Sequence, residues 1–159
     1  MLENCTNAEE RWGGVHQLID HWLKERRELV LCYYRLVDNQ SLADYSTDNA
    51  RALRKLCQIL MDYVSAGHFE IYDQLAKEAE AFGDGGEQLL LELLPQIQAS
   101  TDIALDFNDV FEDDALIQEG WGAVPRLLER LANTLVTRFT LEDRLIETLH
   151  TAHQAHLPH

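Results

Sequence analysis

Basic residues, cysteines and long apolar runs are all scarce in this sequence, and each scarcity excludes a class of protein. The chain has 13 Lys and Arg residues and 28 Asp and Glu residues, so its net charge is −15. No basic patch that could bind nucleic acid is visible. The three cysteines, Cys5, Cys32 and Cys57, are unevenly spaced and form no CxxC pair, which argues against a disulfide framework and a zinc site. No apolar run approaches the roughly 18 residues that span a bilayer, and no signal peptide is visible. We therefore expect a soluble cytoplasmic protein with no membrane partner and no direct nucleic-acid partner.

The acidic residues are concentrated in the middle of the chain. Fifteen of the 28 lie between residues 60 and 119, where Lys77 is the only Lys or Arg. A field of this sign repels nucleic acid and anionic membranes and attracts basic partners. The alternative interpretation is that the charge serves solubility alone.

Apolar residues recur at helical spacing over four stretches, without strand-like alternation or an internal repeat. The expected helices cover about residues 7–37, 49–82 and 87–111 and a fourth stretch from about residue 124. Gly13-Gly14 and Pro95 predict kinks or splits in two of them. The pattern favours an all-α fold, an up-down antiparallel four-helix bundle with long, partly kinked helices. We expect a single domain over residues 1–159, frayed in its first few residues and over residues 154–159.

Three charged or ionisable side chains fall on the apolar stripes of these helices. They are Arg26, His68 and Glu142. Tyr33 lies on the same stripe as Arg26. An unpaired charge in a core is costly, so these groups should meet each other or trapped water. We predict an interior polar network of Arg26, His68, Glu142 and Tyr33. Its simplest role is to fix the register of the helices, and the alternative is catalysis.

The same positions can be compared with helical bundles that hold di-iron sites through His and Glu side chains. The helix around His68 resembles a haemerythrin-type His-x-x-x-Glu helix, with Tyr72 where the glutamate would stand. Phe139 stands where a histidine would precede Glu142. The remaining histidines considered as ligands are His16 and His21. This set is too small and too scattered, so we expect no metal and no cofactor, and a haemerythrin-like metal- or small-ligand-binding bundle remains the alternative.

Motifs of catalysis are absent from the sequence. It contains no GxSxG, no P-loop, no dinucleotide-binding glycine motif and no HExxH. Four histidines recur at every third residue from His150 to His159, and we interpret them as a frayed, solvated tail. The sequence therefore predicts a protein that is not an enzyme.

The segment from residue 62 to residue 72 has two distinct faces on a helical wheel. Asp62, Ser65 and Phe69 lie on a strip that should face solvent, beside the core stripe that carries His68. A phenylalanine held outward near an acid and a serine is typical of a contact surface. The alternative is that Phe69 only covers the edge of the core, since single exposed apolar residues are common.

Several motifs along the chain resemble one bacterial family. They are Arg11-Trp12-Gly13-Gly14, Leu18-Ile19-Asp20 with Trp22-Leu23, Tyr33-Tyr34 before Leu36-Val37, Asp62-Tyr63-Val64-Ser65-Ala66-Gly67-His68-Phe69, and Arg138-Phe139-Thr140-Leu141-Glu142-Asp143-Arg144-Leu145-Ile146. Together they cover almost the whole chain and resemble the Rsd/AlgQ family, most closely its AlgQ side. The Asp-Tyr-x-Ser-Ala-Gly-His-Phe run is the most specific of them.

The resemblance implies an all-α bundle that acts without turnover as an anti-sigma factor. Such regulators bind the primary, housekeeping sigma factor of bacterial RNA polymerase, mainly through its C-terminal domain, which reads the −35 promoter element, and also touch its central domain. Holding that domain blocks its contacts with core polymerase and with DNA. Carried over residue by residue, the sigma contacts fall on Asp62, Ser65 and Phe69. The implied regulator is a monomer that sequesters sigma in a 1:1 complex, and no function is carried into residues 38–47 and 83–88, which follow the family pattern less clearly.

Overall fold

Helices account for all the regular secondary structure in the part of the chain that the structure describes. The computed structural model describes residues 2–83 and 85–151, and it describes side chains for residues 16–83 and 85–150. The all-α prediction is confirmed over these residues. None of the helices there combines the length and the apolar character needed to cross a bilayer.

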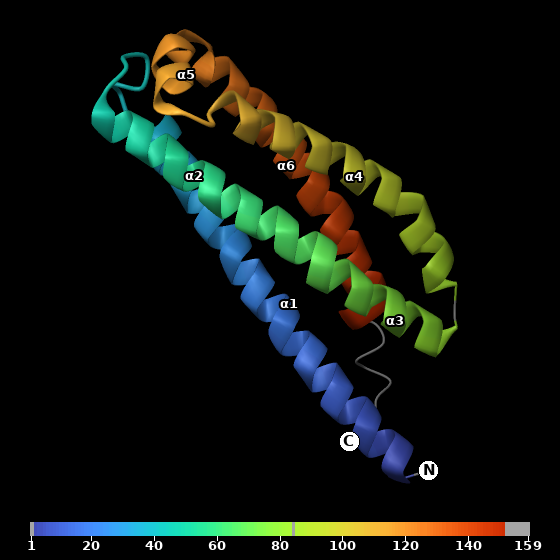
Figure 1. Ribbon diagram of the computed structural model, residues 1–159. Coiled ribbons are helices and arrows are strands. Elements are labelled where there is room, and N and C mark those ends of the chain that lie inside the picture. The colour runs from blue at the N-terminus through green and yellow to red at the C-terminus, as the bar shows by residue number, and fades with distance from the viewer. Residues whose placement is uncertain (1, 84, 152–159) are drawn as a thin grey trace.

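Six α-helices and three short turns of other helix types make up the described chain. The α-helices are α1 (Leu2–Val37), α2 (Thr47–Ala66), α3 (Tyr72–Phe82), α4 (Gly86–Val110), α5 (Asp114–Glu119) and α6 (Val124–Ile146). The turns are the π-helical η1 (Gly67–Ile71) and η3 (Glu147–Thr151) and the 3-10 turn η2 (Trp121–Ala123). Because η1 joins α2 to α3 without a loop, these three elements form one long rod (Figure 1).

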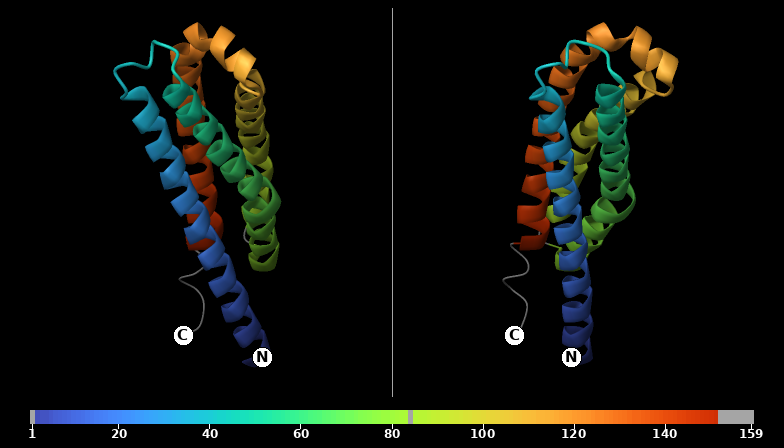
Figure 2. Two further views of the ribbon diagram at one scale, coloured as in Figure 1. Left: turned by 60° about the vertical axis from the view of Figure 1, so that its left-hand side comes forward. Right: turned by 90° about the vertical axis from the view of Figure 1, so that its left-hand side faces the viewer.

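The long helices lie in two layers with one hydrophobic core between them. Helix α1 packs against α2, and α4 packs against α6, while α2 and α3 both contact α4 (Figure 1). Helix α5 lies at the end of the molecule where the loop between α1 and α2 turns, and the N-terminal part of α1 extends past the other helices at the opposite end (Figure 2). Buried apolar side chains from all the long helices fill the space between the layers, among them Leu29, Leu60, Leu93 and Leu128.

Local chemistry explains where the helices begin and end. The extended Ser46 caps α2, because its side chain accepts a hydrogen bond of 3.0 Å from the backbone N–H of Asn49. Gly83 ends α3 in the left-handed conformation at φ 60°, which glycine adopts without steric cost. Pro125 stands in the first turn of α6, where its missing N–H leaves no bond unmade.

Two features of the sequence were expected to interrupt helices and do not divide them. Helix α1 continues through Gly13-Gly14, and α4 continues through Pro95. The alternative that these residues separate shorter helices is therefore wrong. Helix α1 begins at Leu2, and residues 152–159 lie outside the described chain, so the predicted fraying of the two ends remains a prediction.

Candidate functional site

The junction between α2 and α3 is a π turn, and it changes which side chains face the interior. The backbone N–H of Tyr72 donates to the carbonyl of Gly67, five residues earlier, instead of four as in an α-helix. The rod therefore needs one more residue to return to its buried face. His68 is exposed at this turn, whereas Ile71 and Tyr72 are buried. Our prediction that His68 belongs to the interior network is wrong, because it assumed an unbroken α-helical period.

Gly67 lets α1 approach this turn closely. A Cβ atom at Gly67 would lie 3.1 Å from Cζ2 of Trp22 and 3.1 Å from the hydroxyl of Tyr72. The ring of Trp22 also stacks on Tyr63 at 4.8 Å between centroids, and its Nε1 donates to the carbonyl of Tyr63 at 3.1 Å. The absence of a side chain at Gly67 thus brings the two tyrosines of the rod against α1.

A buried carboxylate on α6 is the centre of the interior network. Glu142 is 1% exposed, and its two oxygens accept hydrogen bonds from different tyrosines. Tyr63 donates to Oε1 at 2.6 Å, and Tyr72 donates to Oε2 at 2.5 Å. Short O–H···O distances of this kind are typical of bonds to an ionised acceptor.

Two arginines supply the positive charge that this carboxylate needs. Arg138 is fully buried, and its Nε lies 3.3 Å from Oε2 of Glu142 while its Nη2 donates to the hydroxyl of Tyr72 at 2.8 Å. Arg26 approaches from α1, with Nη2 3.4 Å from Oε1 of Glu142 and Nε donating to the hydroxyl of Tyr63 at 3.0 Å. Each tyrosine hydroxyl therefore stands between one arginine and one oxygen of Glu142.

The outer ends of both guanidinium groups are also occupied. Nη1 of Arg138 donates to the hydroxyls of Ser100 and Thr101 on α4, at 3.1 and 2.7 Å. Nη1 of Arg26 donates to Asp143 at 2.5 Å, and the guanidinium lies over the ring of Phe139 at 4.6 Å. Helices α1, α4 and α6 and the α2–α3 rod thus all contribute to one bonded cluster, whose geometry suits holding the helices in register.

The predicted network is correct in its central pair and wrong in two of its members. The structure brings Arg26 and Glu142 together, as the sequence predicted. Tyr33 does not join them, because its hydroxyl donates to the carbonyl of Leu128 at 3.1 Å. Sequence reasoning missed Arg138, although it stands four residues before Glu142 and therefore on the same face of α6.

Burial determines the ionisation behaviour of the cluster. It raises the pKa of Glu142 above its usual value, although Arg138 and the two tyrosine hydroxyls oppose this shift. Burial and the neighbouring carboxylate raise the pKa values of Tyr63 and Tyr72, so both phenols keep their protons and remain donors. The hydroxyls, guanidinium groups and carboxylate form hydrogen bonds with one another. This arrangement suits a structural role more than proton transfer to a substrate.

A second buried polar contact holds the end of the described chain. His150 is 2% exposed, and its Nδ1 lies 3.2 Å from Oε2 of Glu78 on α3, which is 1% exposed. His16 on α1 stacks on His150, with its Nδ1 3.2 Å from Nε2 of His150. The prediction of a solvated histidine tail is therefore wrong for His150, and the histidines after it lie outside the described residues.

The outer face of the π-turn region carries the residues that the family resemblance singled out. Asp62, Ser65 and Phe69 are all exposed, and Phe69 is exposed at 74%, the highest value for any large apolar side chain with a described environment. The ring of His68 meets the ring of Phe69 edge-on at 4.8 Å between centroids. An aromatic ring presented to solvent beside polar and acidic groups can act as an anchor for a protein partner.

Metal chemistry has little support in the same region. Over the described residues, no group of three or more His, Cys, Asp or Glu side chains is arranged to hold a metal ion. Tyr72, at the position where a haemerythrin-type helix would carry glutamate, donates its hydroxyl hydrogen to Glu142. Cations around Glu142 are the two guanidinium groups of Arg26 and Arg138.

The fold and the site define an acidic, all-helical protein with a buried polar network and an exposed aromatic surface. Residues 1–150 match the model of a family described as "Regulator of RNA polymerase sigma(70) subunit, Rsd/AlgQ". The chain belongs to the Rsd/AlgQ family. This is a family of regulators, in agreement with the prediction that the protein is not an enzyme.

Curated relatives from enteric bacteria are similar over nearly their whole length. The "Regulator of sigma D" of Enterobacter sp. (strain 638) is 37% identical over 147 residues, which cover 92% of this chain and 88% of that protein. The "Regulator of sigma D" of Shigella boydii serotype 4 (strain Sb227) and that of Escherichia coli O139:H28 (strain E24377A / ETEC) are each 35% identical, over 92% of both chains.

Proposed function

We propose that this protein is an anti-sigma factor that binds the primary sigma factor of bacterial RNA polymerase and keeps it from core polymerase. The main contact is with the C-terminal, −35-reading domain of sigma, and Asp62, Ser65 and Phe69 make it. The observation that carries the proposal is the exposure of Phe69, at 74%, on a π turn in a chain whose relatives are named regulators of sigma D.

Charge supports the same partner. A promoter-reading helix-turn-helix is basic because it faces phosphates. Fifteen of the 28 acidic residues of this chain lie between residues 60 and 119, where Lys77 is the only Lys or Arg. An acidic surface can therefore occupy the DNA-facing side of such a domain, with an aromatic side chain as its anchor.

The finer architecture belongs to the same proposal. The long rods form an up-down antiparallel four-helix bundle, one domain that acts in the cytoplasm as a monomer and forms a 1:1 complex with sigma. In this bundle the Glu142 network fixes the inner face of the rod, and the opposite face remains available for the partner. No cofactor takes part in this function.

Three parallel binding measurements test the proposal. Untagged protein is mixed with free primary sigma factor, with its isolated C-terminal domain and with preassembled holoenzyme, and complexes are separated by size exclusion. We expect 1:1 binding to free sigma and to the C-terminal domain and none to holoenzyme, where the surface is occupied. Stable binding to holoenzyme without release of sigma would contradict sequestration.

Substitution of the anchor tests the site itself. Phe69→Ala should weaken binding to the C-terminal domain by at least about 30-fold, the loss expected for a central aromatic anchor. Circular dichroism and the thermal midpoint should stay close to those of the unaltered protein, because the side chain is exposed. Val136→Ala is the matched control, since Val136 is exposed at 64% on α6. Unchanged affinity of both Phe69→Ala and Asp62→Ala would disprove the site assignment.

A further inference from the structure

A groove beside the π turn continues the exposed surface across α3 to α4. It has a volume of about 480 Å³, with His68 and Asp73 on one side and Leu91 on the other. Helices α3 and α4 lie side by side along it (Figure 1). His68 connects the groove to Phe69, because the two rings touch edge-on at 4.8 Å.

The walls of the groove are mainly apolar, and its polar lining residues are His68, Asp73 and Gln98. The apolar lining consists of Tyr72, Ala76, Leu91, Leu94, Pro95 and Ile97. Leu91 is exposed at 67%, which is unusual for a leucine, and is second only to Phe69 among the large apolar side chains with a described environment. An exposed leucine in the wall of the groove and an exposed phenylalanine in contact with His68 of the same groove indicate an interaction surface more than chance exposure.

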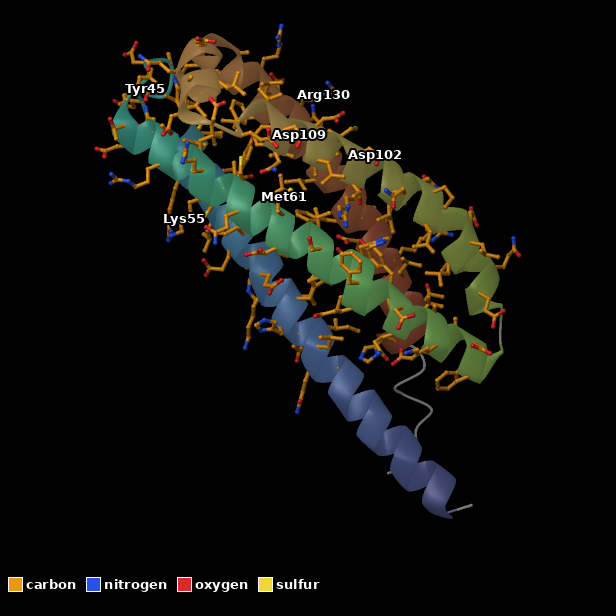
Figure 3. All side chains as sticks on the ribbon, viewed as in Figure 1. Tyr45, Lys55, Met61, Asp102, Asp109 and Arg130 are labelled. Carbon is orange, nitrogen blue, oxygen red and sulfur yellow. The ribbon has the colours of Figure 1, made fainter. Side chains whose placement is uncertain are left out.

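Charge separates the helices of this groove from those of the hollow between α1 and α2. Helices α3 and α4 carry eight acidic residues and one Lys, whereas α1 and α2 carry eight acidic and eight basic residues. The α1–α2 hollow, with a volume of about 530 Å³, is lined by Lys24 and Arg27 together with three acidic residues. No Lys or Arg lines the α3–α4 groove, and the nearby Lys77 is paired with Asp73 at 3.1 Å. In Figure 3, Lys55 lies on the α2 side of the molecule, and Asp102 and Asp109 lie on α4. The α3–α4 groove therefore favours a basic occupant.

We propose that the α3–α4 groove receives an apolar side chain from a basic amphipathic helix of the partner that also covers Phe69. The inference rests on the proposed function, because it assigns the groove to the same sigma domain. A helix laid across Phe69 and Leu91 places apolar anchors on both sides of His68 and its basic face over the acidic residues of α3 and α4. Leu91 on α4 then becomes a second anchor, in addition to the three residues on the rod.

Alanine substitution of Leu91 tests this proposal, with another leucine of the same helix as control. Leu105 is exposed at 41% on α4 and does not line the groove. Calorimetric titration with the C-terminal domain of sigma should show about tenfold weaker binding for Leu91→Ala and less than about a twofold change for Leu105→Ala. Because the lost contact is apolar, the ratio for Leu91→Ala should be the same at low and at high salt.

Each other outcome has a definite meaning. Equal affinities of Leu91→Ala and the unaltered protein, with Phe69→Ala weakened, overturn the groove and leave the proposed function intact. Equal losses for Leu91→Ala and Leu105→Ala also overturn it, because the effect then does not depend on the groove. A dimer of the unaltered protein that Leu91→Ala abolishes, measured by sedimentation, assigns the groove to a second copy. Failure of the unaltered protein to bind the sigma domain overturns both proposals.

Discussion

The inner and outer faces of the segment Asp62–Tyr72 both carry aromatic side chains, but in different environments. The inner face carries two aromatic rings whose hydroxyls are bonded to a buried carboxylate on α6. The outer face carries an aromatic ring and a carboxylate, in Phe69 and Asp62, and both are exposed. Residue type alone does not separate a supporting group from a binding group, whereas burial and bonding partners do. Variants of each face should therefore affect different measurements.

The largest effect is expected from breaking the inner face. Glu142→Ala leaves the guanidinium of Arg138 buried without its carboxylate, and loss of one partner of a buried pair costs about 3–5 kcal/mol. Urea denaturation should show this loss in the free energy of unfolding. Glu129→Ala, at an exposed glutamate on the same helix, should change it by less than about 0.5 kcal/mol. Similar values for the two variants would mean that the network adds nothing to stability.

A smaller loss of stability is expected at Gly67. An alanine there forces its Cβ against Trp22 and Tyr72, and overpacking of this kind costs about 1–3 kcal/mol, more than alanine gains in helix propensity. Gly122→Ala is the control, because a Cβ at Gly122 meets no atom within 4 Å. Thermal unfolding of the two variants should give a lower midpoint only for Gly67→Ala. Equal midpoints would show that Trp22 moves aside at little cost.

The long helices can be predicted from the sequence, whereas several members of the buried network cannot. The long helices follow from apolar residues at a period near 3.6, and that signal is strong over stretches of this length. The same period misplaced His68, because a π turn leaves no mark in residue type and shifts the buried face by one residue. Arg138 was missed because a charged residue is normally assigned to the surface, although its spacing to Glu142 was visible. Tyr33 was wrongly assigned to the network because the positions of the helices along the long axis of the molecule, relative to one another, cannot be determined from the sequence.

The pH dependence of stability gives a further test of the inner face. Burial raises the pKa of Glu142 in the folded protein, so the folded state holds this proton more tightly than the unfolded chain. The stability linked to that proton is fully present below the pKa of an unfolded glutamate and is lost as pH rises through the raised folded pKa. The unaltered protein should therefore lose stability relative to Glu142→Gln as pH rises from the acid range to neutrality. Urea titrations at several pH values measure this difference, and the opposite trend would mean that Arg138 and the tyrosines outweigh burial.

The smallest effect is expected for a single charge on the outer face. Asp62→Asn removes one exposed carboxylate, and exposed ion pairs contribute about 0.2–1 kcal/mol. Binding to the C-terminal domain of sigma should weaken by less than about fivefold at low salt, and the difference should disappear near 0.5 M salt. Titrations at two salt concentrations measure it. Loss of thermal stability instead of affinity would place Asp62 with the inner face.

The π turn also constrains how this chain can change in length. An α-helix rotates by about 100° for each residue, so one residue added or removed turns everything that follows it. Helices α2 and α3 are two amphipathic segments whose phases differ by this step, and η1 absorbs the difference within one rod. A deletion inside η1 would let the rod become a regular helix while changing which side chains it displays there. An insertion or deletion in the middle of α2 or α3 is not compensated in this way and would rotate core residues into solvent. The site of proposed recognition is thus also the place where this rod can accommodate a change of length.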